Sequence, residues 1–287
     1  MIPYKNNILL FGGSGFLGNN FSNLLKKQNN NHSIISSKDI NLIDTESKSK
    51  LTDLNNCENC ILIFFSALTP DKGKNIDTYN NNIKMAENFL SVFNDEFKNN
   101  NHIIYISSDA VYPLTIENIE FDTYPSPTDL YSSMHLTREI MFKNVFKRNL
   151  TILRPTLIYG YGDTHNSYGP NRFFRQMLDK NEINIFGEGS DVRDHLYIND
   201  LCRIIYEIIK NKIYGTLNLA TGNSISYSDL ALIYKNMFKE IKINKIPVNN
   251  QKTVRYFNVK SFLDSINYSV NSLEDNLAEY SKLLGIK

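Results

Sequence analysis

The stretch LLFGGSGFLG, residues 9–18 of this 287-residue chain, decides the fold. An apolar run leads into it and a periodic apolar pattern follows, which predicts a strand, a tight turn and a helix. Its glycines have the spacing that lets a backbone turn sharply, approach a pyrophosphate and pack a helix on its strand. A glycine triplet alone would be weak evidence, but in this context it predicts a dinucleotide site rather than a structural turn. The expected contacts are Gly12, Ser14, Gly15, Phe16, Leu17 and Gly18.

Short apolar runs alternate with longer periodic stretches through the first half of the chain. We expect strands at 7–11, 32–36, 61–67, 102–108 and 150–155, and helices at 17–27, 82–93 and from Tyr131 onward. Such alternation predicts βαβ units and a parallel sheet covered on both faces. The fold class is therefore α/β, with a Rossmann-type doubly wound parallel sheet in residues 1–165.

After residue 160 the pattern loosens into YGDTHNSYGPNRFF, residues 161–174, which we interpret as a loop segment. Strands are expected within 183–189, 216–220 and 241–248, and helices within 200–211, 228–238 and 272–285. Residues 166–287 are thus predicted to form a smaller α/β substrate-binding lobe, with 195–235 returning in part to the Rossmann sheet.

Composition narrows the class of partner. The 31 Lys and Arg residues nearly balance the 30 Asp and Glu residues, and no basic stripe interleaves with aromatics. This argues against nucleic acid and acidic membranes as partners. No apolar run reaches membrane-spanning length and no signal peptide is recognisable, so we expect a cytoplasmic protein. Cys57 and Cys60 lack a second ligand pair, so we predict no metal site and a loop instead.

The residues after the second strand bear on the choice of dinucleotide. The sequence IISSKD places Ser36, Ser37 and Lys38 before any acid, and hydroxyls with a cation suit a 2′-phosphate. This favours NADP over NAD. The alternative is that Asp39, slightly later in the chain, holds the ribose of NAD.

With these motifs in view, the chain resembles the extended short-chain dehydrogenase/reductase family of the NAD-dependent epimerase/dehydratase type, whose members mostly act on nucleotide-linked sugars. The resemblance rests on the glycine turn, FFSALT, NNNIKMAENFL, YISSDAVY, Tyr131 on its helix, LRPTLIYG and FGEGSDVRDHLYINDL. It implies that Ser108 hydrogen-bonds the reacting oxygen and that Tyr131 exchanges a proton with it. Arg193 and Arg255 would clamp the pyrophosphate of a nucleotide-sugar substrate, as a guanidinium suits phosphate oxygens.

The same resemblance implies further contacts. On the cofactor side these are Ser66, Ala67, Asn82, Tyr131, His135 and Pro155. On the substrate side they are Asp109, Ala110, His165, Asn171, Arg172 and Phe186, besides the two arginines. The family also implies a homodimer through the helices at 82–93 and 131–146.

Details near Ser108 separate the activities within the family. Dehydratases carry an acid and a base after the serine or threonine, whereas here Asp109 is followed by Ala110, so the base is missing. SSDAVYP and SSKDINLID look most like the 4-ketoreductases of deoxysugar pathways. The cysteine of the epimerising fucose enzymes falls on Ala110, which argues against that step. Because FGEGSDVRDHLYINDL is shared with 4-epimerases, a simple 4-epimerase is the alternative.

Four residues after Tyr131, where the family has lysine, stands His135. Our preferred interpretation is that His135 does the lysine's work, holding the nicotinamide ribose and, best when protonated, activating the phenol. The competing possibility is that His135 is a neutral hydrogen-bonding or packing residue on the helix. A second interpretation is different chemistry, with His165 and Asp163 supplying acid or base. A third is a non-catalytic dinucleotide-binding module, against which the otherwise complete site argues.

Overall fold

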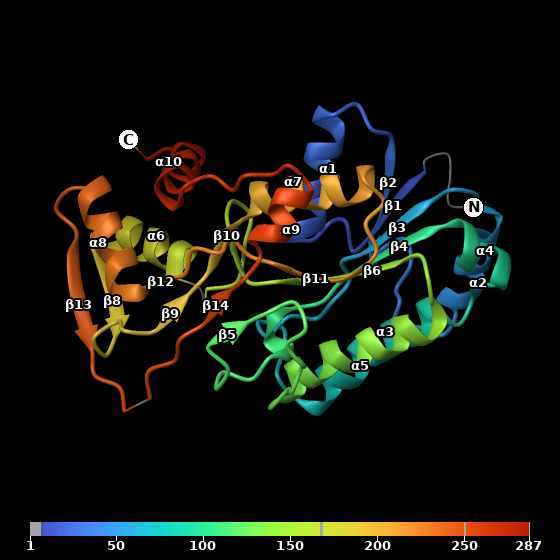
Figure 1. Cartoon of the computed structure of the whole chain (residues 1–287), viewed down its shortest axis with the longest axis horizontal. Coiled ribbons are helices and arrows are strands. Elements are labelled where there is room, and N and C mark those ends of the chain that lie inside the picture. The colour runs from blue at the N-terminus through green and yellow to red at the C-terminus, as the bar shows by residue number, and fades with distance from the viewer. Residues whose placement is uncertain (1–6, 167–168, 250, 287) are drawn as a thin grey trace. The chain divides into compact units, whose positions relative to one another are not determined.

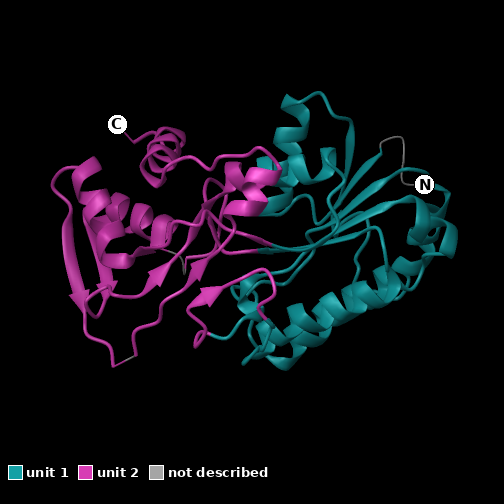
Figure 2. Ribbon diagram, in the orientation of Figure 1, with its two compact units in different colours: residues 1–113, 124–154, 202–217 teal, residues 114–123, 155–201, 218–287 magenta. Residues whose placement is uncertain are grey.

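The computed structural model describes residues 7–166, 169–249 and 251–286, and the chain divides into two compact units (Figures 1 and 2). Unit 1 comprises residues 1–113, 124–154 and 202–217, and unit 2 comprises 114–123, 155–201 and 218–287. This division differs from the predicted boundary at residue 165. Residues 202–217 belong with unit 1 because they bond to it: the Tyr206 hydroxyl accepts from Asn30 (3.1 Å), and Thr151 donates to the Ile213 carbonyl (2.6 Å).

Unit 1 is built on a six-stranded sheet, which confirms the Rossmann-type fold. The strand order is β11-β6-β4-β3-β1-β2. The strands are β1 (Ile8–Phe11), β2 (His32–Ile35), β3 (Ile61–Phe64), β4 (His102–Ile106), β6 (Leu150–Pro155) and β11 (Gly215–Leu219). Strand β1 pairs in parallel with both β2 and β3, and β4 pairs in parallel with β3 and β6. The predicted return of the later chain to this sheet is the strand β11.

Helices cover both faces of the sheet. Figure 1 shows α3 (Ile76–Leu90) and α5 (Leu130–Val145) running side by side along one face, with α1 (Phe16–Lys27) and α7 (Ile198–Lys210) on the other. Short segments α2 (Ser47–Leu51), η1 (Thr52–Asn56), α4 (Asp95–Asn100) and η2 (Asp109–Val111) connect them. Under α3 and α5 lies an aromatic core: Phe64 contacts the rings of Phe89 and Phe142 with centroids 4.7 and 5.4 Å apart. This core fixes the sheet-facing side of α5.

The chain reverses direction across the sheet at β1, because β2 lies on one side of β1 and β3 on the other. In open α/β sheets such a switch point is where ligands bind, beyond the carboxyl ends of the strands. The glycine turn stands there. Gly12 has φ +76°, and a Cβ on it would lie 2.8 Å from the Ser66 hydroxyl, so no other residue fits.

The described residues of unit 2 form four two-stranded sheets and four complete helices, besides the first turn of α7. The sheets are β8 (Glu182–Phe186) with β13 (Lys242–Ile246), β7 (Leu157–Tyr159) with β10 (His195–Tyr197), β9 (Val192–Arg193) with β12 (Ile225–Ser226), and β5 (Asn118–Ile119) with β14 (Tyr256–Phe257). The helices are α6 (Gly169–Lys180), α8 (Tyr227–Met237), α9 (Lys260–Ser265) and α10 (Leu273–Leu283).

Helix α6 replaces part of the predicted loop segment at 161–174. Two signals in the sequence indicate it: Pro170 stands in its first turn, where the missing N–H costs nothing, and Phe173, Phe174 and Met177 form a buried stripe at helical spacing. The polar residues before it hid that periodicity. Across the described part of the chain, no helix is long and apolar enough to cross a bilayer.

Gly18 and Gly15 have separable roles, which leads to a first prediction. A Cβ at Gly18 would lie 2.4 Å from the Gly13 Cα, so Gly18→Ala must push α1 off the turn and should cost about 1–3 kcal/mol of unfolding free energy. A Cβ at Gly15 meets only the Gly12 carbonyl oxygen at 3.4 Å. Gly15→Ala should therefore keep stability while weakening dinucleotide binding at least about tenfold. Urea denaturation and calorimetry measure the two effects, and equal stabilities of the two variants would contradict this account of the turn.

Candidate active site

The amino terminus of α1 offers unpaired backbone donors to an anion. Its N-cap is Gly15, which gives no side-chain cap, and no acidic residue stands in the first turn. Ser14 and Gly15 are exposed, so the first N–H groups of the helix are open to solvent. Backbone donors and the helix dipole suit a pyrophosphate. The turn therefore fits the dinucleotide predicted from the sequence.

The residues that follow β2 are not arranged as a 2′-phosphate site would require. One carboxylate oxygen of Asp39 accepts hydrogen bonds from the backbone N–H of Ser36 (2.9 Å) and from its hydroxyl (2.6 Å), and these lower the pKa of Asp39. The Ser36 hydroxyl, predicted to hold a 2′-phosphate, is thus bonded to a carboxylate that would repel one. Ser37 and Lys38 are exposed. The preference for NADP loses part of its support.

Helix α5 begins where a capping box fixes it. Asp129 accepts from the Ser132 N–H (2.8 Å), and the Ser132 hydroxyl accepts from the Asp129 N–H (3.1 Å). Tyr131 is thereby held in the first turn. Residues at i+4, i+7 and i+11 share its face of the helix, and these are His135, Arg138 and Phe142. This stripe places three polar side chains over the sheet.

Ser108 and Tyr131, the predicted catalytic pair, come together. Ser108 is the N-cap of η2, where its hydroxyl accepts from the Ala110 N–H (3.1 Å). Burial raises the pKa of the Tyr131 phenol and the Asp109 carboxylate raises it further, while a hydrogen bond with Ser108 and the charge of Arg138 lower it. A phenol held protonated near a serine hydroxyl can act as a proton donor to an oxygen placed between them.

His135 is buried beside Tyr131. It is 3% exposed, its ring packs edge-on against Tyr131 (4.7 Å between centroids), and its Nδ1 hydrogen-bonds the Tyr105 hydroxyl (2.9 Å). Burial, with a smaller effect of Arg138, lowers the pKa of His135 to about 3. Burial therefore favours a neutral imidazole here over the protonated one that suits activation of the phenol.

The other ring nitrogen of His135, Nε2, is still available for the predicted contact with the cofactor. Within the described residues its Nε2 is buried without a hydrogen-bond partner. A buried nitrogen without a hydrogen bond costs free energy, because it gave up its hydrogen bond to water when the chain folded. A ligand group that forms a hydrogen bond with this nitrogen would remove that cost. A ribose hydroxyl would satisfy it, since a hydroxyl both donates and accepts. The residue fits a dinucleotide as a neutral anchor.

Arg138 was not predicted as part of the site. It is fully buried, with Nη2 donating to the Ser66 carbonyl (2.7 Å) and Nη1 near the Asn82 amide oxygen (3.4 Å). Its guanidinium also lies over the rings of Phe64 (4.8 Å) and Tyr105 (5.1 Å). Asn82 in turn bonds both backbone groups of Leu68. Three predicted cofactor contacts, Ser66, Asn82 and His135, thus surround one buried cation.

A buried ion pair stands beside it. Arg154 donates to both carboxylate oxygens of Glu139 (2.9 and 2.6 Å) and to the Tyr112 hydroxyl (2.7 Å). Ser107 donates to Glu139 as well (2.7 Å). This network joins α5 to β6 and to the end of β4. Two adjacent charges on a helix that faces a core, Arg138 and Glu139, are the sequence signal that could have identified both buried groups.

In unit 2 the predicted phosphate clamp Arg193 is half-buried. Its guanidinium donates to the carbonyls of Val192 (2.8 Å) and Thr253 (3.0 Å) and to the Thr253 hydroxyl. Among the described residues it forms no ion pair with a carboxylate. Its charge is therefore available to an anion. Arg255, the second predicted arginine, is buried at 4% exposure.

The remaining predicted substrate contacts divide into two kinds. The Arg172 guanidinium lies over Phe186 (4.8 Å), where an aromatic face and a cation are both partly open. Asn171, by contrast, is fully buried: it bonds the Gly160 N–H (3.1 Å) and the Asp163 carboxylate. Asn171, predicted to bind the substrate, thus holds the loop before α6 in this structure.

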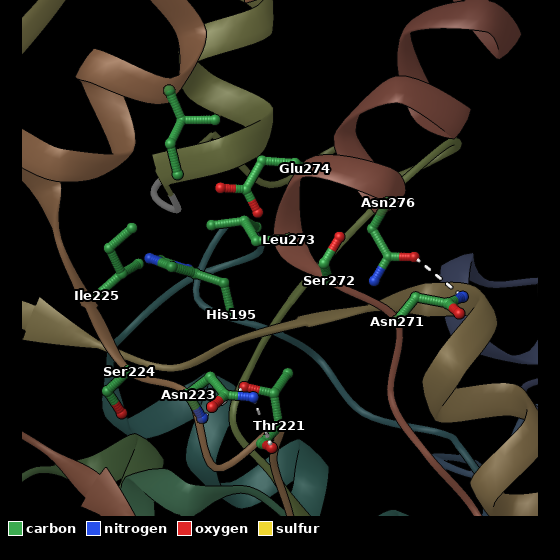
Figure 3. A pocket seen from close by; sticks show the side chains of 11 residues that line it. His195, Thr221, Asn223, Ser224, Ile225, Asn271, Ser272, Leu273, Glu274 and Asn276 are labelled. Carbon is green, nitrogen blue, oxygen red and sulfur yellow. Dashed lines mark hydrogen bonds between the residues drawn. The ribbon is translucent and has the colours of Figure 1, made fainter.

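A cavity of about 330 Å³ in unit 2 was also missed (Figure 3). His195 points into it, 4% exposed, and both ring nitrogens lack a partner among the described residues, as does the Ser224 hydroxyl. The amino terminus of α10, with Ser272 and Glu274, forms another wall. Polar atoms left unpaired in a cavity require water or a ligand. No sequence motif marks His195, which follows Arg193 and Asp194 at the start of a short strand, as a residue that lines a cavity.

Cys57 and Cys60 are buried free thiols between η1 and β3. No group of metal-binding side chains is present in the part of the chain that the structure describes. The Asn101 side chain bonds the Cys60 N–H (2.6 Å) and the Cys57 carbonyl (3.1 Å), so the pair belongs to a fixed connection before β3.

These features define a nucleotide-dependent enzyme of the short-chain dehydrogenase/reductase class, and comparison with known proteins agrees. The family model described as NAD dependent epimerase/dehydratase family matches residues 8–220. The chain belongs to the NAD-dependent epimerase/dehydratase family, whose members modify nucleotide sugars, as the resemblance implied.

One protein that is similar in sequence and two solved structures that are similar in fold illustrate the relatives of the chain. GDP-6-deoxy-D-talose 4-dehydrogenase of Aggregatibacter actinomycetemcomitans is 26% identical over 271 residues, 93% of this chain and 90% of that protein. The solved UDP-glucose 4-epimerase of Thermotoga maritima with UDP-glucose has a TM-score of 0.81 at 18% identity, covering 97% and 98% of the chains. The dTDP-glucose 4,6-dehydratase of Bacillus anthracis in complex with NAD has a TM-score of 0.80 at 17% identity, covering 98% and 96%. At such identities the solved structures show the fold alone.

Buried histidines make stability depend on pH, which is the second prediction. Burial lowers the pKa of His102 to about 4 and those of His135 and His195 to about 3, from about 6.5 in an unfolded chain. The folded protein therefore binds fewer protons, so stability is complete above pH 6.5 and falls as pH drops towards 4. At pH 5 each histidine should cost about 2 kcal/mol.

His102→Gln, which can keep the bond to Thr151 (2.7 Å), tests this by urea denaturation at pH 7 and pH 5. The variant should reduce the loss between the two pH values by about 2 kcal/mol. His32→Gln is the control, since that ring is only half-buried. If wild type and His102→Gln lose the same unfolding free energy between pH 7 and pH 5, His102 takes up its proton in the folded protein without a cost in stability.

Proposed function

We propose that the protein is an NAD(P)-dependent oxidoreductase that interconverts a 4-keto group and a hydroxyl on a nucleotide-linked sugar. The Ser108–Tyr131 pair carries this proposal, because a serine hydroxyl near a protonated tyrosine suits transfer of one proton to one oxygen. The similarity to a 4-dehydrogenase over 93% of the chain supports it. Reduction is the favoured direction.

The bound nicotinamide would supply a hydride to C4 of the sugar. Tyr131 gives its phenolic proton to the C4 oxygen, and the Ser108 hydroxyl hydrogen-bonds that oxygen as its negative charge grows. One hydride and one proton convert the ketone to an alcohol, and Tyr131 is left as a phenolate. In the reverse direction the phenolate takes the hydroxyl proton.

The residue after Asp109 supports this activity over dehydration. Elimination of water needs a base to take a carbon-bound proton, and Ala110 has no proton-accepting group. The second candidate is 4-epimerisation, a reaction in which a retained cofactor would take and return the hydride. The stretch FGEGSDVRDHLYINDL favours it.

In unit 2 we assign Arg193 to the substrate pyrophosphate, because its charge has no carboxylate partner among the described residues. We also propose a homodimer through α3 and α5, where Ile140 is 60% exposed.

Turnover of nucleotide sugars is the third prediction. With reduced cofactor and GDP- or dTDP-linked 4-keto-6-deoxyhexoses, the protein should consume cofactor in proportion to alcohol formed. Tyr131→Phe should lower turnover about 100- to 10,000-fold, while Tyr124→Phe, an 87% exposed tyrosine, should not. Chromatography of the sugar product with cofactor absorbance measures both. Inversion at C4 without net cofactor change would assign the epimerase instead, and loss of neither activity in Tyr131→Phe would refute the proposed site.

The cofactor is the subject of the fourth prediction. We infer that NAD is used, because the Asp39 carboxylate stands at the end of β2. NADH should bind at least as tightly as NADPH, and Asp39→Ala should improve NADPH binding about tenfold by removing its repulsion. Lys38→Ala is the matched control at the neighbouring exposed position. Calorimetric titration measures these affinities. If wild type binds NADPH more tightly than NADH, and Lys38→Ala loses that difference, the preference for NADP predicted from the sequence is correct.

A further inference from the structure

Arg138 is a buried cation for which the structure provides no carboxylate. The described residues contain no ion pair to it, and its Nε lacks any hydrogen-bond partner. Its neighbour Glu139 is engaged by Arg154 instead. Within the described residues the guanidinium donors reach neutral acceptors alone: the Ser66 carbonyl, the Asn82 amide oxygen and the Met134 sulfur. Burying an unpaired charge costs free energy, so a residue that does so needs a compensating role.

Arg138 acts on His135 and on two tyrosines, Tyr105 and Tyr131. Its guanidinium lies over the Tyr105 ring (5.1 Å), and its Nη1 lies 3.4 Å from the amide oxygen of Asn82, which lines one small pocket together with Tyr131. The charge of Arg138 lowers the pKa of both phenols. The hydroxyl of Tyr105 is engaged with His135 (2.9 Å). Tyr131 is the phenol that the proposed reaction ionises. A cation placed near it stabilises the phenolate more strongly inside a protein than in water, because the effective dielectric constant is lower.

We infer that Arg138 is a positioning residue that supplies, from about one helical turn beyond His135, the positive charge that the family's lysine gives at that position, and so stabilises the phenolate of Tyr131. This inference rests on the proposed function. It divides the lysine's two tasks between two side chains: His135 offers a neutral nitrogen to the ribose, and Arg138 offers the charge. The carbonyl of Ser66 and the rings of Phe64 and Tyr105 hold the guanidinium in place.

The other charges around Tyr131 oppose this effect. Asp109 in η2 and Asp129, the N-cap of α5, both raise the pKa of the phenol. Lys74, in the loop before α3, lines the small pocket beside Tyr131 but is exposed. His135 is neutral and Glu139 is neutralised by Arg154. In the described chain Arg138 is thus the buried cation that counteracts two carboxylates.

The competing account is that Arg138 only braces the backbone at Ser66. Two substitutions separate charge from bracing: Arg138→Gln keeps an amide donor for the carbonyl and removes the charge, whereas Arg138→Lys keeps the charge and loses the planar fork. Adding His135→Lys to Arg138→Gln returns the charge to the family's position. Arg148→Gln, at an exposed arginine of the same unit, is the control for loss of one positive charge.

The first measurement is the pH dependence of sugar oxidation at saturating cofactor, which should rise as Tyr131 ionises. Arg138→Gln should move this rise to higher pH by about one unit and lower turnover at pH 7 about tenfold. Arg138→Lys should stay within a few-fold of wild type, and the double variant should regain most of the loss. An unshifted profile in Arg138→Gln, or a double variant as slow as Arg138→Gln at equal thermal stability, overturns the inference.

The second measurement does not need a sugar. Ultraviolet titration of the cofactor-bound protein, corrected by the same variant carrying Tyr131→Phe, follows the Tyr131 phenolate directly. Its pKa should be about one unit higher in Arg138→Gln than in wild type. If the Tyr131 pKa shifts but no sugar is turned over, the proposed function is wrong and the inference about Arg138 stands. If sugar is turned over but the Tyr131 pKa does not shift, the inference is wrong and the proposed function stands.

If Arg138→Gln does not fold, Arg138→Lys decides, because it keeps the charge and loses the planar fork. Its pH profile and its Tyr131 pKa should stay within about 0.3 unit of wild type, with turnover within a few-fold. A loss of turnover of about tenfold or more with an unshifted pH profile, at equal thermal stability, would show that Arg138 acts as a brace and not through its charge.

Discussion

The bidentate ion pair between Glu139 and Arg154 is the constraint on which the site of unit 1 depends. It joins α5 to β6, and through Ser107 it reaches the end of β4. Both partners are buried, so removing either would leave an uncompensated charge at a cost of about 3–5 kcal/mol. The pair fixes the rotation of α5 about its axis. That rotation decides which helical face, the one bearing Tyr131, His135 and Arg138, lies over the sheet.

Given this rotation, the residues at 135 and 138 have to be considered together. Both side chains are buried on one face of α5, and Arg138 already lowers the pKa of His135. Two cations there would repel each other in a medium of low dielectric constant. A histidine avoids the repulsion because it can remain neutral while still offering a ring nitrogen. Histidine in place of the family's lysine is therefore what a buried arginine three residues later requires.

The extent of prediction from sequence follows from what each feature depends on. The glycine turn, the five early strands and Tyr131 were predictable because local spacing and periodicity define them. The ionisation of His135 and the burial of Arg138 were not, since both depend on what α5 packs against. The stripe Tyr131, His135, Arg138, Phe142 is nevertheless visible at helical spacing. An arginine within such a stripe, followed by a glutamate, indicates buried charge rather than a solvated surface.

The two units handle charge in a similar way, each considered by itself. In unit 1 Arg138, and in unit 2 Arg193, are anchored through backbone carbonyls and neutral side-chain oxygens rather than carboxylates. A carbonyl orients a guanidinium without neutralising it, so the positive potential persists for an anion that is present only during function. In the roles that we propose, that anion is the substrate pyrophosphate for Arg193, and for Arg138 it is the phenolate formed when Tyr131 gives up its proton. Anchoring by neutral acceptors is thus the structural feature that distinguishes these arginines from Arg154, whose charge is already balanced by Glu139.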